Sequence, residues 1–287
     1  MKSIAWQAGC LLWLGMAVCN CTPASSGEDY ASYVNPFIGT GGHGHTYPGA
    51  VVPNGMTSAE PRHAHLSVGC CSGYYYADST INGFSHTHLS GTGCGDYGDV
   101  LLDAHRGAVE DYHAMGKKSQ QMAYASPFSH GREKAEPGYY SVFLDRYGVQ
   151  AELTSTKRAA IHRYTFPKSG KAGFILDLDY SLQRQKNEEM KLEVISDTEI
   201  RGHKKTVYWA FDQYINFYAK FSKPFTYTMV TDSMALDEGE PLLPTAKVLL
   251  QFQTEKDEQV MVKVGVFSCG YGRCPPECGS GDTRMGF

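Results

Sequence analysis

Two glycine-rich blocks, NPFIGTGGHGHTYPG at residues 35–49 and GFSHTHLSGTGCGDYGD at residues 83–99, set the organisation of this 287-residue chain. Glycine lets a backbone turn sharply and approach a ligand closely. Polar side chains on such loops usually form a site when a rigid scaffold holds the loops. The two blocks therefore predict a pair of site-forming loops, for which the rest of the chain has to supply the scaffold.

The scaffold that the remaining sequence predicts is all-β. Along residues 215–222 apolar side chains alternate with polar ones, which is the period of a strand with one buried face. Many short strands without a long helical period indicate a large antiparallel β-sandwich. The same alternation occurs at 149–154, 190–195 and 260–266, and further strands are expected at 139–146, 159–166, 173–178, 206–211, 225–230 and 247–253.

Charge and cysteine content limit the classes of partner and compartment. The net charge is −4 and no basic run is present, so nucleic acid is not an expected partner. The chain has nine cysteines. An exported protein can form disulfides, but the sequence does not fix their pairing.

The first residues predict export. Lys2 precedes an apolar run at 4–18 that is too short for a membrane-spanning helix. The box MAVC at 16–19 is similar to a bacterial lipoprotein cleavage site with Cys19 as the lipidated residue, although a smaller residue than Val18 is usual there. An ordinary signal peptide is the alternative. We expect a lipoprotein-type signal peptide at 1–19, a flexible tether at 20–29, and a periplasmic or outer-membrane protein attached through the lipid on Cys19.

The two glycine-rich blocks closely resemble the start of glycoside hydrolase family 92, the calcium-dependent exo-acting α-mannosidases of bacteria. The resemblance continues in PGYYS (137–141), ELT (152–154), HRYTF (162–166) and WAFD (209–212), and covers nearly all of residues 30–266. It implies a galactose-mutarotase-like N-terminal β-sandwich, which in the family packs against an (α/α)6 helical barrel. It also implies hydrolysis of terminal α-linked mannose in glycans, with inversion and with calcium as cofactor.

The resemblance also implies that catalysis depends on residues outside the sandwich. The family carries its acid and base carboxylates, and most calcium ligands, on the helical domain. We expect residues 30–266 to be the N-terminal domain alone, truncated before that domain and inactive by itself. A carbohydrate-binding or structural β-sandwich module without catalytic activity is the alternative. An isolated sandwich should also self-associate through the apolar face that would otherwise pack on the barrel.

Each glycine-rich block carries a His-x-His pair, His43 with His45 and His86 with His88. In a strand this spacing places both rings on one face, so the rings can converge on a sugar or, with carboxylates nearby, on a metal. The alternative is that the histidines brace the loops by hydrogen bonds. Calcium prefers oxygen ligands, which argues against histidine as its holder. The resemblance suggests that these loops line the edge of a pocket for mannose-containing glycans.

Asp96 and Asp99 belong to the same candidate substrate-binding set. An inverting glycosidase needs two carboxyl groups roughly 6.5–9.5 Å apart, and sequence spacing alone cannot establish that geometry. Because the family carries its acid and base on the helical domain, we expect the two aspartates to cap the turn or to bind sugar. Metal ligation by either is the remaining option, and no catalytic residue is assigned in this chain.

Two aromatic motifs allow different interpretations. Tyr74, Tyr75 and Tyr76 are equally suited to stacking on sugar and to packing in a sandwich core with the hydroxyl at its rim. The motif at 209–212 has a strand-like context, and we expect it to pack in the core.

Two stretches depart from the family pattern. Residues 58–70 read SAEPRHAHLSVGC, where the family pattern is roughly QLSPDTR followed by a substrate-contacting Trp-Asp pair. Suitable codons read one nucleotide later spell QLSPDTRISVWD, so we expect a local frameshift. We expect the same of the tail at 267–287, for which the rival is a Cys-x4-Cys-x3-Cys knot that lacks a clear fourth ligand. Fresh sequencing of the coding DNA would refute the expectation if the shifted frame is absent.

Overall fold

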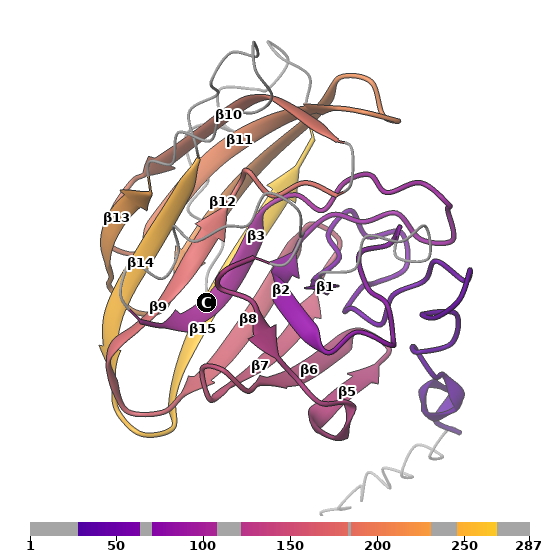
Figure 1. Ribbon diagram of the computed structural model, residues 1–287, viewed down its shortest axis with the longest axis horizontal. Helices are drawn as coiled ribbons and strands as arrows, with labels where there is room; N and C mark the ends of the chain where they lie inside the picture. Colours follow the sequence, from indigo (N-terminus) through magenta and orange to yellow (C-terminus); the bar gives the residue numbers. More distant parts are fainter. Residues whose placement is uncertain (1–27, 64–70, 108–121, 183–184, 231–245, 269–287) are drawn as a thin grey trace, which may run out of the picture. The chain divides into compact units, whose positions relative to one another are not determined.

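A computed structural model describes residues 28–63, 71–107, 122–182, 185–230 and 246–268 (Figure 1). The expected signal peptide, the lipidated Cys19, residues 64–70 of the first departing stretch and the tail from 269 lie outside these residues. From Ala31 onward the described chain forms one compact unit. No helix in the described ranges is long and apolar enough to cross a membrane.

The expected all-β antiparallel sandwich is confirmed, as two layers in the part of the chain that the structure describes (Figure 1). Short 3-10 turns lie at η1 (Tyr30–Tyr33) and η4 (His130–Arg132). The seven-stranded sheet runs in the order β1 (Glu60–His63), β2 (Thr80–Ser85), β3 (Leu101–Arg106), β9 (Ser169–Asp177), β14 (Lys247–Thr254) and β13 (Thr226–Val230), with β4 (Ser126–Pro127) beside β2. The eight-stranded sheet runs in the order β10 (Lys186–Val194), β11 (Glu199–Val207), β12 (Gln213–Phe221), β15 (Glu258–Phe267), β8 (Ala159–Phe166), β7 (Val149–Ser155), β6 (Tyr139–Leu144) and β5 (Glu133–Glu136).

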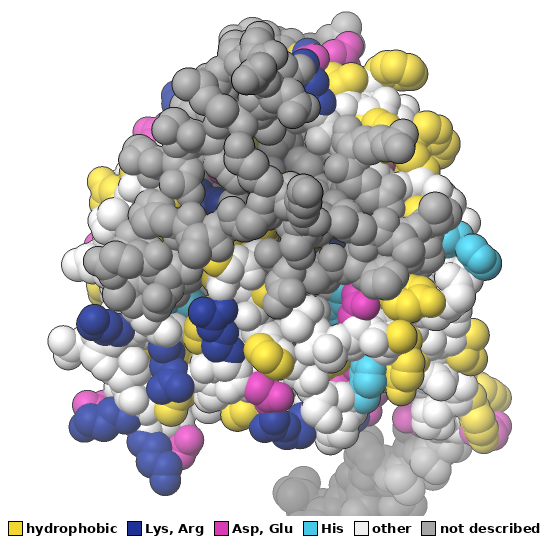
Figure 2. All heavy atoms as spheres, in the orientation of Figure 1, with side chains coloured by type: hydrophobic (Ala, Val, Ile, Leu, Met, Phe, Trp, Pro, Cys, Tyr) yellow, Lys and Arg dark blue, Asp and Glu magenta, His cyan; other side chains and the backbone are white. Residues whose placement is uncertain are grey.

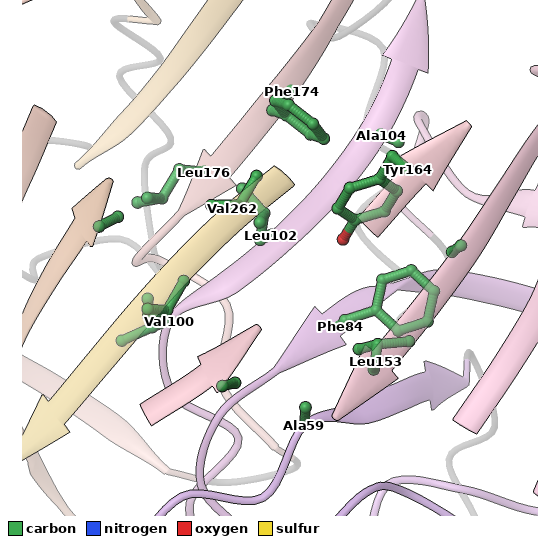
Figure 3. Close-up of a cluster of buried hydrophobic side chains, with 14 of the residues drawn as sticks. Ala59, Phe84, Val100, Leu102, Ala104, Leu153, Tyr164, Phe174, Leu176 and Val262 are labelled. Carbon is green, nitrogen blue, oxygen red and sulfur yellow. The ribbon is translucent and has the colours of Figure 1, made fainter. Parts of the chain in front are cut away.

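The core lies between the two sheets because their strands alternate as the sequence predicted. Burial along β12 switches at every residue, so one face points inward and the other faces solvent. Figure 3 shows Phe84 and Phe174 of the first sheet near Tyr164 of the second. The ring centroids of Phe174 and Tyr164 are 4.9 Å apart, and those of Phe84 and Tyr164 are 6.1 Å apart. The packed aromatic rings fix the two sheets face to face.

The surface of the sandwich carries charges of both signs. Figure 2 shows basic and acidic side chains next to one another along the lower edge of the visible face. Exposed ion pairs such as Lys168 with Glu255 (2.9 Å) and Arg163 with Glu152 (2.6 Å) are of this kind. Pairs of this type contribute little stability, so the fold depends on its core.

The strand expected at 206–211, and the core packing expected for 209–212, are wrong. β11 ends at Val207, and Tyr208 begins a turn in which Asp212 has a φ of +53°. Trp209 is 61% exposed and Phe211 85% exposed. In the sequence the apolar residues at 209–211 resemble part of a strand. The backbone reverses between β11 and β12, however, so the side chains of Trp209 and Phe211 lie in solvent.

The short strand β1 has an unusual burial pattern. All four of its residues are buried, although they include Glu60 and Arg62. A strand with one face in the core normally alternates, and a buried charge is costly unless it is paired. β1 therefore brings polar groups into the interior directly beneath the glycine-rich loops.

Candidate functional site

The glycine-rich loops lie against each other and against the segment that follows β1. The Gly91 amide donates to the His45 carbonyl at 2.7 Å, and the Ser72 hydroxyl donates to the Thr46 carbonyl at 3.0 Å. A Cβ at Gly44 would lie 2.1 Å from the Gly39 carbonyl oxygen, so only glycine fits that turn. The structure thus brings together the two blocks that the sequence singled out.

The first histidine pair lies at the surface of this loop cluster. His43 is exposed and His45 half-buried, and their ring centroids are 6.1 Å apart. His45 has a φ of +55°, a left-handed conformation that is uncommon for residues other than glycine. These two side chains are the histidines of the set that lie near solvent, where a ligand can reach them.

His86 lies in the interior instead, at one end of a chain of hydrogen bonds. Its Nδ1–H donates to the Val100 carbonyl at 2.6 Å, and its Nε2 lies 3.0 Å from Nε2 of His162. His162 Nδ1 accepts from the Tyr164 hydroxyl at 2.9 Å. When both imidazole rings are neutral, every N–H or O–H donor in this row of hydrogen bonds faces an acceptor.

The burial of His86 decides between the roles considered for it. Burial lowers the pKa of His86 to about 4. It also lowers the pKa of His162, to which His86 adds a further lowering. A proton added to Nε2 of His86 would face the Nε2–H of His162, so the hydrogen bond between the two rings would be lost. His86 therefore braces the loop against β8, and its side chain has no solvent-facing surface with which to touch a sugar.

His88 is buried in a second polar cluster, together with Arg62 and Glu60. Its Nδ1 lies 2.9 Å from the Ser72 carbonyl oxygen and 2.6 Å from Glu60 Oε2. The Arg62 guanidinium donates to the carbonyls of Ser72 (2.7 Å) and Thr87 (3.0 Å). Arg62 thus joins the segment after β1 to the second glycine-rich loop. Sequence reasoning singled out His88 but missed Glu60 and Arg62, because they lie on β1, far from His88 in the sequence.

Burial favours the uncharged forms of Glu60 and His88, the two ionisable side chains beside Arg62. Burial raises the pKa of Glu60 well above its usual range, while Arg62 acts in the opposite direction. Burial, and then Arg62, lower the pKa of His88. Glu60 Oε1 has no hydrogen-bond partner among the described residues, and the one close polar contact of Oε2 is His88 Nδ1 at 2.6 Å. The cluster is an internal brace that leaves one carboxyl group poorly satisfied.

Asp96 and Asp99 are fully buried and hydrogen-bonded within the protein. Asp96 accepts from the amides of Tyr97 (2.9 Å) and Ala210 (2.8 Å). Asp99 Oδ2 accepts from the Thr87 hydroxyl and the Gln213 amide, both at 2.8 Å, and its Oδ1 lies 3.4 Å from Lys204 Nζ. These hydrogen bonds agree with the expectation that the two aspartates cap the turn. With their oxygens engaged, the aspartates are not placed to activate water or to protonate a leaving group.

The described residues do not fit the calcium ion that the family implies. No group of three or more His, Cys, Asp or Glu side chains in the described ranges is arranged to hold a metal. Calcium takes six to eight oxygen ligands, whereas the carboxylates of Asp96 and Asp99 are already engaged by protein donors. We therefore derive no step through calcium from these loops.

A cavity of about 260 Å³ opens beside the second glycine-rich loop. Tyr97 and Gln213 give it polar walls, and Met56 and Ile215 give it apolar ones. Tyr97 has a φ of +68°, and burial raises the pKa of its hydroxyl. A pocket that combines apolar walls with a few polar groups is suited to a small ligand.

The aromatic residues around the loops divide between core and surface. Tyr74 is buried, and its hydroxyl lies 3.1 Å from both Glu133 oxygens. Tyr76 is 45% exposed and stacks on His130 with ring centroids 4.1 Å apart. The exposed turn at Trp209 is fastened to the loops, because Asp96 accepts from the amide of Ala210. Exposed aromatic side chains, Tyr76 and Trp209, therefore lie at the surface around the loop cluster.

Comparison with known proteins identifies relatives of this arrangement. A family model described as "Glycosyl hydrolase family 92 N-terminal domain" matches residues 33–266. A family 92 α-mannosidase from Bacteroides thetaiotaomicron, solved with mannoimidazole, is 34% identical with a TM-score of 0.72, over 82% of this chain and 32% of that one. A family 92 inverting mannosidase from the same organism is 26% identical with a TM-score of 0.64, over 82% and 31%.

A curated relative has no assigned substrate. An uncharacterized secreted glycosidase from Arthroderma benhamiae is 33% identical over 172 residues, which are 58% of this chain and 21% of that protein. The chain thus spans about a fifth of this curated relative and about a third of the solved mannosidases.

Proposed function

Because the chain belongs to glycosyl hydrolase family 92, as its N-terminal domain, we propose that it supplies the glycan-facing loops of an exported α-mannosidase. The observation that carries this proposal is that the two glycine-rich blocks contact each other and that the second block lines a cavity. The solved relatives named as α-mannosidases support mannose as the sugar. The ligand would be a glycan that ends in α-linked mannose.

The reaction proposed for the whole enzyme is hydrolysis by direct displacement with inversion. A carboxylic acid protonates the leaving oxygen while a carboxylate activates water on the opposite face of the sugar. A relative named as an inverting mannosidase supports this stereochemistry. Asp96 and Asp99 are buried and hydrogen-bonded, so we assign neither role to them. This sandwich would position the sugar, and other residues would perform the chemistry.

Export, calcium and attachment to a membrane complete the proposal. A relative named as secreted supports export, and lipidation of Cys19 would hold the protein at the outer membrane. Calcium, if the whole enzyme uses it, would be held by oxygen ligands other than Asp96 and Asp99. Trp209 and Phe211 would contact a partner surface or a second copy of the chain, because exposed aromatic groups promote association.

The second candidate function is a sandwich that binds glycan weakly, or serves only as a scaffold, without catalysis. The engaged carboxylates favour it for the described residues. Under this second candidate the sandwich does not position a sugar for a catalytic centre, whereas under the first it does.

Titration of the 287-residue protein with methyl α-mannoside by calorimetry tests the glycan-facing loops. We expect a dissociation constant on the order of millimolar, which corresponds to about −4 kcal/mol. His43→Ala and Trp209→Ala should each weaken binding severalfold, because these side chains are exposed on the first glycine-rich loop and on the turn fastened to the second. Tyr227→Ala is the matched control, since Tyr227 is a 53% exposed aromatic residue on the edge strand β13. Absence of heat at high millimolar ligand would reject the glycan-facing role.

A further inference from the structure

We propose that Cys71 and Cys94 form a disulfide bond in the exported protein, which ties the segment after β1 to the second glycine-rich loop. In the structure both residues are thiols, Cys71 buried and Cys94 half-buried. The proposal adds a covalent modification site to the loop cluster and does not depend on the sugar that the cluster binds. It rests on export, because disulfides persist in oxidising compartments.

The residue that follows Cys71 contacts the loop that carries Cys94. The carbonyl of Ser72, next to Cys71, lies 2.9 Å from Nδ1 of His88. Arg62 donates both to that carbonyl and to the carbonyl of Thr87. The segment that carries Cys71 is therefore fastened directly to the loop that carries Cys94.

The part of the second loop next to Cys94 approaches from the same side. Ser72 donates to the carbonyl of Thr46, and Gly91 donates to the carbonyl of the adjacent residue His45. A Cβ at Gly93 would lie 4.0 Å from His45 Nε2. The two cysteine-bearing segments thus contact adjacent residues of the first loop, Thr46 and His45.

The electrostatics of Cys94 agree with this placement. The pKa of its thiol is raised, first by burial, then by Asp96 and then by Cys71. An effect of one thiol on the other requires that the two lie near each other. The contacts place the two segments side by side, and this mutual influence agrees with a Cys71 thiol that lies near the Cys94 thiol.

The bond would form by exchange with a small disulfide such as oxidised glutathione. Cys94 is the more exposed thiol, so after losing its proton it attacks one sulfur of glutathione disulfide and expels a glutathione thiolate. The deprotonated Cys71 then attacks the Cys94 sulfur of the mixed disulfide and expels the second glutathione thiolate. The two protein thiols lose two protons and two electrons, and one glutathione disulfide is reduced to two glutathione molecules.

Peptide mapping without reduction tests the proposal on the whole chain. The protein is equilibrated with oxidised glutathione, alkylated in denaturant, digested and analysed by mass spectrometry. We expect a cross-linked pair of peptides containing Cys71 and Cys94, lighter by two hydrogens than their sum. Cys70→Ser is the matched control, since it should keep the link. Cys71→Ser and Cys94→Ser should each abolish it.

Reduction should have a measurable effect on the folded protein. A bridge between residues 71 and 94 closes a loop of about 24 residues, so reduction should lower Tm by about 5–10 °C. Cys94→Ser should make Tm insensitive to the reductant. Alkylation of both thiols after oxidation, or a link from Cys94 to Cys70, would overturn the proposal. Neither result bears on mannoside binding, so the proposed function would fail or stand separately.

Discussion

Asp99→Ala is expected to lower the free energy of unfolding by about 3–5 kcal/mol, the usual cost of removing one partner of a buried pair. Asp99 accepts from Thr87 and Gln213, and it is 3.4 Å from the buried ammonium of Lys204. Burial lowers the pKa of Lys204, and Asp99 is the largest influence that opposes this lowering. Alanine would remove the acceptor of two donors and the carboxylate beside the Lys204 ammonium, which would keep its hydrogen bond to the Tyr180 carbonyl. Chemical denaturation measures the loss.

Two companion variants give this prediction its controls. Asp99→Asn keeps one carbonyl oxygen, so it should cost less than Asp99→Ala. Glu136→Ala removes one partner of the ion pair with Lys134, whose side chains are 54% and 62% exposed; it should change stability by less than about 1 kcal/mol. If Asp99→Ala left stability unchanged but removed mannoside binding, Asp99 would be a sugar ligand rather than a brace.

His86 should make the protein sensitive to acid. Burial holds the pKa of His86 at about 4 in the folded protein, below the ordinary value of 6.5 for histidine. The unfolded chain therefore binds this proton first, so the contribution is fully present above pH 6.5 and is lost as the pH falls toward 4. By pH 4.5 the loss should reach about 2.5 kcal/mol.

Comparison with His86→Gln isolates this effect. Glu60 and Asp103 have pKa values raised by burial, so they titrate with the opposite sign, but they are present in both proteins and largely cancel. Unfolding free energies measured from pH 7.5 to 4.5 should therefore fall more steeply for the native protein than for His86→Gln. Parallel curves for the two proteins would show that His86 is not held neutral by its buried position.

Much of the scaffold could be predicted from the sequence because its strands alternate locally. Residues 149–154 and 260–266 were placed correctly, since one face of each strand is buried and the other is not. The prediction failed at 206–211, where Trp209 and Phe211 continue an apolar pattern but lie in a turn. The positive φ of Asp212 marks that turn, and no glycine or proline signals it in the sequence.

The candidate site could be predicted only as a set of loops. The glycine spacing indicated that residues 35–49 and 83–99 would form loops of one site, and they do meet. The role of His86 was open because its partner, His162, is 76 positions away in the sequence. The cluster of Arg62, Glu60 and His88 could not be predicted for the same reason, since Arg62 and His88 are 26 positions apart in the sequence. A short motif identifies polar residues, but contacts between distant strands decide which of them are buried.

We propose that these loops position a glycan, while the buried carboxylates of Asp96 and Asp99 brace the fold and perform no hydrolysis. The most direct measurement is release of mannose from an α-linked dimannoside by the purified 287-residue protein with added calcium. The account predicts no release above the rate without protein, because Asp96 and Asp99 are engaged in the interior. Release at an ordinary enzymatic rate, lost in Asp96→Asn or Asp99→Asn, would contradict it.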